Sequence, residues 1–225
     1  AFALRRAWLF SIIHAYDEAF EALEGVIEHE GLNEDLALGQ GRLLRLLDPV
    51  GIDDWFGEVL EAHPTWSRFR DDRILLRMDR AEFDAAITEA RRGVEATPDE
   101  LLALRRLAVL LLDYGKGPVD WVESGALTRR TLVIEPRHPG GWRALAFSLG
   151  RTGEMDGAEE AMREAVRLTP FDHRYLGQLA LLLDDRGKRV EAEEAHAEAM
   201  RLWAANGSVG DAPQLPQDTV GPVRP

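Results

Sequence analysis

The stretch from Pro139 to Pro170, PGGWRALAFSLGRTGEMDGAEEAMREAVRLTP, decides the fold of this chain. In its first half, large and small apolar residues recur at the spacings i, i+3, i+4 and i+7, which mark one face of an α-helix: Trp142, Leu145, Ala146 and Leu149. The second half carries a stripe with the same period: Ala158, Ala161, Met162, Ala165 and Leu168. Gly153 lies between the two stripes. The stretch therefore predicts two helices joined by a turn.

The same unit recurs along the chain. Its prolines are separated by 34, 38 and 34 residues: Pro64, Pro98, Pro136 and Pro170. Three glycines repeat the last two intervals: Gly115, Gly153 and Gly187. The four extra residues therefore lie between Gly115 and Pro136. Thr97-Pro98 and Thr169-Pro170 are expected to start helices, with the threonine as cap and the proline in the first turn. No sustained period-two alternation indicates strands.

A helix-turn-helix period of 34 residues resembles the tetratricopeptide repeat. The unit that opens at Pro139 has the signature spacing through Trp142, Gly153 and Pro170. The next unit carries Leu176, Leu179, Ala180, Leu183, Gly187, Ala192, His196 and Ala199, and the preceding one Leu104, Leu107, Ala108, Leu111 and Gly115. The resemblance implies an all-α fold, a right-handed superhelical array of antiparallel helix pairs with about five to six units.

Three regions are expected. Residues 1–64 would be degenerate, acidic N-terminal helical repeats, 65–204 the array itself, and 205–225 a disordered tail rich in Pro and Gly. Within the array, Arg70, Arg73 and Arg77 share one helical face, which leaves the register of that unit open by a residue or more.

Composition excludes several classes of protein. The 225 residues include 27 Lys+Arg, 40 Asp+Glu and no Cys, for a net charge of −13. Without Cys there is no disulfide framework, thiol nucleophile or Cys-based zinc site. An acidic chain is a poor match for nucleic acid, because phosphate affinity comes from Lys and Arg. No apolar run approaches the length that spans a bilayer, and a cytoplasmic location is expected.

Candidate chemical sites are weak, so the chain is expected to be no enzyme and to need no metal or cofactor. The six His include no pair at metal-ligand spacing. Gly39-Gln40-Gly41 lacks the third glycine and the strand of a dinucleotide loop. Adjacent acids such as Asp53-Asp54 and Asp71-Asp72 point to different sides of a helix and are expected to be solvated.

The resemblance also implies a groove lined by the first helix of each unit. Carried over to this chain, it gives a candidate peptide- or protein-binding set: Arg105, Arg106, Val109, Arg143, Phe147, Arg151, Arg174 and Gln178. Guanidinium groups favour carboxylates and phosphates, so an acidic or carboxylate-bearing segment is one expected ligand. The alternative is that these arginines pair with acids of the chain, such as Asp113 and Asp185. Chaperone-binding members of the family carry Asn at one position of the first helix. The equivalent residues here are Val109, Phe147 and Leu181, which disfavours a heat-shock adaptor.

The leading hypothesis is a non-enzymatic interaction scaffold that binds a partner segment in the groove. Two alternatives stay open. The chain could be a helper or regulatory module of a larger enzyme, for example a transferase, or a structural scaffold that associates with itself.

Overall fold

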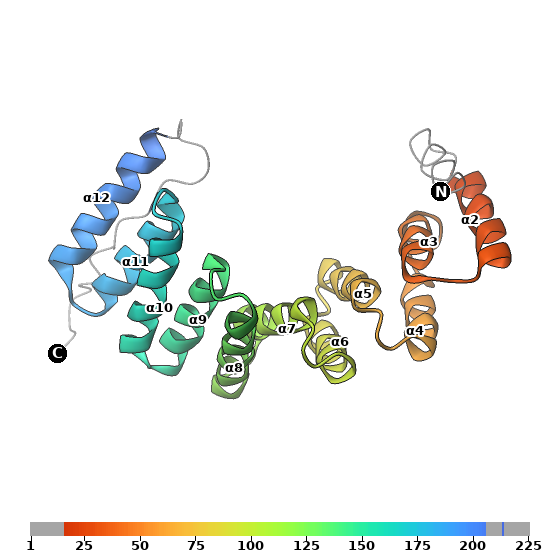
Figure 1. Ribbon diagram of the computed structural model, residues 1–225, viewed down its shortest axis with the longest axis horizontal. Coiled ribbons are helices and arrows are strands. Elements are labelled where there is room, and N and C mark those ends of the chain that lie inside the picture. The colour runs from red at the N-terminus through yellow and green to blue at the C-terminus, as the bar shows by residue number, and fades with distance from the viewer. Residues whose placement is uncertain (1–15, 206–212, 214–225) are drawn as a thin grey trace, which may run out of the picture. The chain divides into compact units, whose positions relative to one another are not determined.

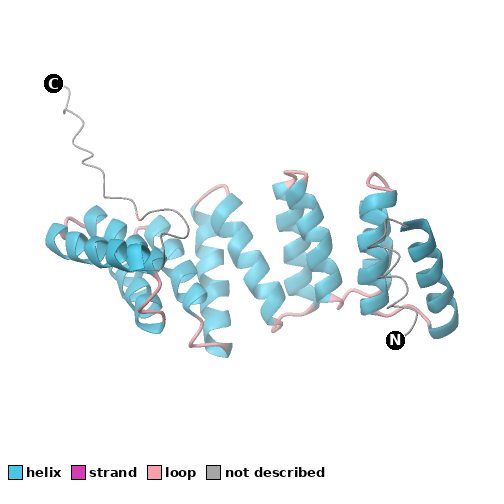
Figure 2. Cartoon of the chain, turned by 90° about the horizontal axis from the view of Figure 1, so that it is seen from above, coloured by secondary structure: helices cyan, strands magenta, loops and turns pink. Residues whose placement is uncertain are grey.

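The computed structural model describes residues 16–205 and Pro213 (Figure 1). The helices of this part are α2 (Tyr16–Glu30), α3 (Glu34–Leu47), α4 (Ile52–Ala62), α5 (Ser67–Asp79), α6 (Phe83–Ala96), α7 (Leu101–Tyr114), α8 (Pro118–Ile134), α9 (Pro139–Thr152), α10 (Met155–Leu168), α11 (His173–Asp185) and α12 (Arg189–Ala205). The described residues contain no strand, and short loops connect their helices (Figure 2). This confirms the all-α prediction.

The chain forms two compact units, which divide after Leu110 within α7. The prediction that residues 1–64 are degenerate repeats and residues 65–204 the main array stays a prediction. Residues 1–15 and nearly all of the predicted tail lie outside the described residues. No helix of the described part is long and apolar enough to cross a membrane.

The pair α9 and α10 shows how the sequence forms one helix-pair repeat. His138 caps α9, because its Nδ1 accepts a hydrogen bond from the Gly141 N–H at 2.9 Å, and Pro139 occupies the first turn. Gly153 ends the helix at a φ of 85°, a left-handed conformation that a glycine adopts without strain. The Glu154 N–H then donates to the Leu149 carbonyl at 2.9 Å, which closes the turn before α10 begins.

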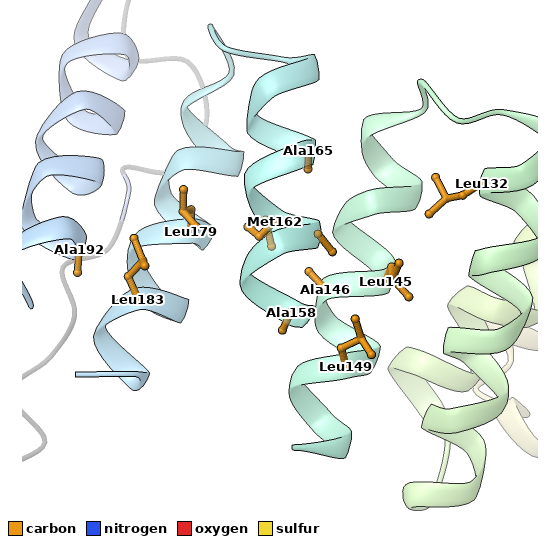
Figure 3. Close-up of a cluster of buried hydrophobic side chains, with 11 residues drawn as sticks. Leu132, Leu145, Ala146, Leu149, Ala158, Met162, Ala165, Leu179, Leu183 and Ala192 are labelled. Atoms are coloured by element: carbon orange, nitrogen blue, oxygen red, sulfur yellow. The ribbon is translucent and has the colours of Figure 1, made fainter. Parts of the chain in front are cut away.

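The core of the second unit lies between these helices and their neighbours α8, α11 and α12 (Figure 3). Ala158, Ala161 and Ala165 of α10 are at most 3% exposed. Their small side chains allow α9 and α11 to approach closely, while larger residues fill the space around them: Leu145, Leu149, Met162, Leu179 and Leu183. The apolar stripes predicted from the sequence are therefore the core.

The Thr-Pro pairs were predicted to start helices, and this is wrong. Thr97 and Thr169 instead follow the last residues of α6 and α10. The Thr169 hydroxyl donates to the Ala165 carbonyl at 2.8 Å, in addition to the bond of 3.1 Å that the Thr169 N–H makes to the same carbonyl, so Thr169 caps the end of this helix. The cap of α11 is Asp172, whose carboxylate accepts from the Arg174 N–H at 3.0 Å. A threonine hydroxyl can bind the backbone at the start or at the end of a helix, and the sequence alone does not distinguish these two roles.

The four-residue insertion lies where the spacing predicted it. The second helix of that repeat, α8, has 17 residues, against 14 in α10, and the loop before α8 has three residues (115–117), against two (153–154) before α10, which together make four. Its buried face includes hydroxyls: the Ser124 Oγ lies 3.1 Å from the Ser148 Oγ of α9, and the Thr128 hydroxyl donates to the Ser124 carbonyl. These bonds satisfy polar groups that would otherwise be costly to bury.

The first unit has a core of its own, formed by apolar side chains of α3, α4 and α5. Phe56 and Phe69 are at most 1% exposed and their ring centroids lie 4.7 Å apart, with Trp55 and Trp66 packed against them. Aromatic residues therefore fill, in this unit, the space that Leu and Met fill in the second.

Candidate protein-binding site

A pocket of about 410 Å³ opens in the second unit. Three consecutive helices line it: Ala146, Phe147, Gly150 and Arg151 of α9, Met155 and Met162 of α10, and Gln178, Leu181, Leu182 and Asp185 of α11. Two of these lining residues, Ala146 of α9 and Met162 of α10, also belong to the buried cluster and are labelled in Figure 3. A concave, largely apolar pocket with a few polar groups is typical of a binding site.

The spacing of the lining residues explains how two helices share the pocket. On α11, Gln178, Leu181 and Asp185 follow one another at i, i+3 and i+7, so they lie on one face. On α9, Phe147 and Arg151 are one turn apart. Because α9 and α11 are the first helices of successive helix-pair repeats, their equivalent faces line the same pocket.

The polar groups of the pocket differ in how they are held. The Arg151 guanidinium donates to the Leu112 carbonyl and lies 5.4 Å from the centroid of the Trp121 ring, which fixes its direction. Arg143 is not a lining residue, but its guanidinium lies 5.6 Å from the centroid of the Phe147 ring. The Gln178 Oε1 is buried and has no hydrogen-bond partner among the described residues. A buried acceptor without a donor is costly, but this oxygen has almost no accessible surface, so Gln178 lines the pocket with the rest of its side chain.

Five of the eight predicted site residues lie in the second unit. Phe147, Arg151 and Gln178 line the pocket, and Arg143 contacts it through Phe147. The Arg174 side chain instead binds Asp172, the residue that caps the start of α11. Its Nη2 lies 2.6 Å from the Asp172 carboxylate, and this bond lowers the pKa of Asp172.

The other three, Arg105, Arg106 and Val109, belong to the first unit. The Arg106 Nη2 donates to the Asp71 carboxylate of α5 at 2.8 Å, with both side chains largely buried. An ion pair was the predicted alternative for these arginines, but Asp71 is the partner here, not Asp113. Val109 is 42% exposed and Arg105 is half-buried.

The expectation that adjacent acids are solvated is wrong for Asp53 and Asp71. Two arginines of α5 hold Asp53: the Arg73 Nη2 and the Arg77 Nη2 donate to it at 3.0 Å and 3.1 Å. Partial burial raises the pKa of Asp53, and these bonds outweigh it and hold the pKa well below its ordinary value. Asp54 is exposed, as expected.

The same α5 face holds a buried carboxylate that the sequence did not reveal. Glu89 of α6 is 1% exposed and forms ion pairs with Arg70 and with Arg73, whose Nη1 lies 3.1 Å away. The arginine stripe that left the register of this unit open is therefore an internal charge network between α4, α5 and α6. A stripe of three arginines was a signal for buried acids, although the acids lie in other helices.

A smaller network ties α10 to the chain that leads into α12. The Lys188 Nζ donates to both Glu159 oxygens at 2.9 Å, and the Arg186 Nη1 lies 2.7 Å from one of them. Burial raises the pKa of Glu159, but the hydrogen bonds from Lys188 and Arg163 outweigh it, so the pKa is lowered. These charges are engaged in holding the unit together.

The helices α9 and α11 that line the pocket are two of those from which the sequence predicted binding residues, and their binding role stays a prediction. Met155 and Met162 also line it and come from the second helix of the repeat, whose apolar stripe was predicted only as core. Within the described ranges, no group of three or more His, Cys, Asp or Glu is arranged to hold a metal ion.

Solved structures of other proteins have a similar arrangement. A crystal structure of MamA matches 75% of this chain and 96% of its own, with a TM-score of 0.64 and 19% identity. PilW, a type IV pilus biogenesis factor, matches over 94% of each chain with a TM-score of 0.64 and 14% identity. A tetratricopeptide repeat protein from Parabacteroides merdae matches 91% of this chain and 86% of its own, with a TM-score of 0.63 and 15% identity. No family model and no curated protein matches the sequence.

At these identities the likeness concerns the fold. It agrees with the helix pairs, with the left-handed glycine at the turn of α9 and with the small residues of α10. The described chain has the tetratricopeptide-repeat fold, as its 34-residue period predicted.

Proposed function

We propose that this chain is a non-enzymatic scaffold that binds a segment of a partner protein in the pocket between α9, α10 and α11. The observation that carries the proposal is the apolar pocket itself, in which Phe147 and Leu181 remain exposed. An extended peptide supplies the complement, since its side chains can fill such a pocket.

The partner segment is expected to carry one large apolar side chain. Leu181 and Phe147 are 41% and 37% exposed, and they would be covered by such a side chain. Arg143, whose guanidinium lies over the Phe147 ring, would bind an acidic residue next to that side chain. Arg106 and Arg174 already hold carboxylates of the chain, so the proposed preference for acidic ligands rests on Arg143.

Arg105, Arg106 and Val109 form a second proposed contact area, in the first unit. Val109 is exposed, but Arg106 is held by Asp71 and would have to exchange that partner for a ligand. We therefore expect this area to contribute less than the pocket.

A peptide-library selection tests the pocket. Peptides enriched on the wild-type chain should bind at least about tenfold more weakly to Leu181→Asp, because the new carboxylate would be desolvated by the bound apolar side chain. Val190→Asp is the matched control, since Val190 is 70% exposed on α12 and outside the pocket. Equal binding of the selected peptides to all three chains would refute a binding role for the pocket.

A further inference from the structure

Pro213 packs against α11, the first helix of the last repeat. It is half-buried, and it lies beside Gly177 of α11, which is buried. A Cβ added to Gly177 would stand 3.5 Å from the Pro213 Cβ and 4.0 Å from its Cα, which is ordinary van der Waals contact. The proline ring therefore lies against the helix where no side chain separates it from the backbone.

This contact is next to the pocket. Gly177 directly precedes Gln178 and lies one turn before Leu181, and both of these residues line the pocket. With a rise of 1.5 Å per residue, Leu181 is roughly 6 Å further along α11. A residue that sits on Gly177 is thus at the edge of the pocket.

The sequence after Pro213 has the chemistry that the pocket lacks. It continues Gln214-Leu215-Pro216. Prolines at both ends favour an extended polyproline conformation, which advances about 3.1 Å per residue and leaves its N–H groups without internal partners. Two such steps span about 6 Å, which equals the distance from Gly177 to Leu181 along α11. A segment that follows α11 toward Leu181 would therefore bring the apolar Leu215 to an apolar pocket.

We propose that the chain's own segment 214–216 occupies this pocket, with Leu215 between Phe147 and Leu181. The tail is then an internal ligand, and an outside partner has to displace it. That competition rests on the proposed function, whereas occupancy by the tail does not depend on it.

The absence of Cys from the sequence allows a direct test in the full chain. The double variant Gln178→Cys/Gln214→Cys should form an intramolecular disulfide under mild oxidation at least about tenfold faster than Val190→Cys/Gln214→Cys, because a docked tail raises the effective concentration of the two thiols. Adding Leu215→Asp should remove most of this advantage, and adding Val220→Asp should not. Mass spectrometry and non-reducing gels give the rates and separate intramolecular from intermolecular bonds.

Two results would overturn the proposal. Disulfide-linked dimers as the main product would assign the pocket to the tail of a second copy. A rate that Leu215→Asp does not change would show that Leu215 is not anchored in the pocket. In either case, peptides that still discriminate Leu181→Asp from Val190→Asp would leave the proposed function standing. If the tail is docked, Leu215→Asp should also strengthen the binding of those peptides by about tenfold, since the pocket is then open.

Discussion

At the scale of single residues, the first unit depends on charges that the sequence pattern hides. Asp53 and Asp54 are adjacent and chemically identical, yet Asp53 is held by Arg73 and Arg77 while Asp54 is exposed. Helical geometry explains the difference, since neighbouring residues point about 100° apart and only one of them can face α5. The two carboxylates therefore form a natural pair of test and control.

Asp53→Asn should destabilise the chain by about 1–3 kcal/mol at neutral pH, because two largely buried arginines would lose a charged acceptor. The pKa of Asp53 is lowered in the folded chain, so its contribution is present above the unfolded pKa, near 3.8, and is lost as pH falls toward the folded value. The difference between wild type and variant in urea unfolding should therefore shrink below about pH 4. Asp54→Asn should show neither effect, and a similar loss in both variants would contradict the role given to Asp53.

At the scale of helices, the sequence predicted what depends on local periodicity. The stripes of α9 and α10, the Gly153 turn and the extra length of α8 all follow from spacing along one segment. The Thr-Pro pairs, the partner of Arg106 and the acids beneath the α5 arginines could not be predicted in this way. Asp71 is 35 residues from Arg106, and such pairs are fixed by how helices pack. For the same reason, the sequence named residues of α9 and α11 but did not indicate that Met155 and Met162 of α10 line the same pocket.

The close approach of α10 to its neighbours leads to a prediction about size. Ala161 is 3% exposed in the core of the second unit, so Ala161→Trp should overpack it and destabilise the chain by about 1–3 kcal/mol. Ala197→Trp is the control, because Ala197 is exposed on α12. Thermal unfolding of the three chains makes the comparison, and an Ala161→Trp midpoint equal to that of wild type would contradict the packing of α10.

At the scale of the whole molecule, each of the two units has its own core. Aromatic residues and a charge network hold the first, and Leu, Ala and Met hold the second. The net charge of −13 does not report this division, because much of the charge in the first unit is paired internally. In repeat proteins, stability is close to a sum of intrinsic terms and nearest-neighbour interfaces. A destabilising substitution in one unit should therefore weaken mainly the helices around it.

Glu89→Gln tests this locality. The substitution removes the buried carboxylate that pairs with Arg70, while Arg73 keeps Asp53, and breaking such a buried pair typically costs about 3–5 kcal/mol. Amide hydrogen exchange should become faster in α5 and α6 and change little in α11 and α12, because local opening follows the weakened contacts. Glu95→Gln, on the exposed side of α6, should leave every helix as in wild type. Equal acceleration across all helices of Glu89→Gln would mean that the two units unfold as one cooperative body, which the separate cores argue against.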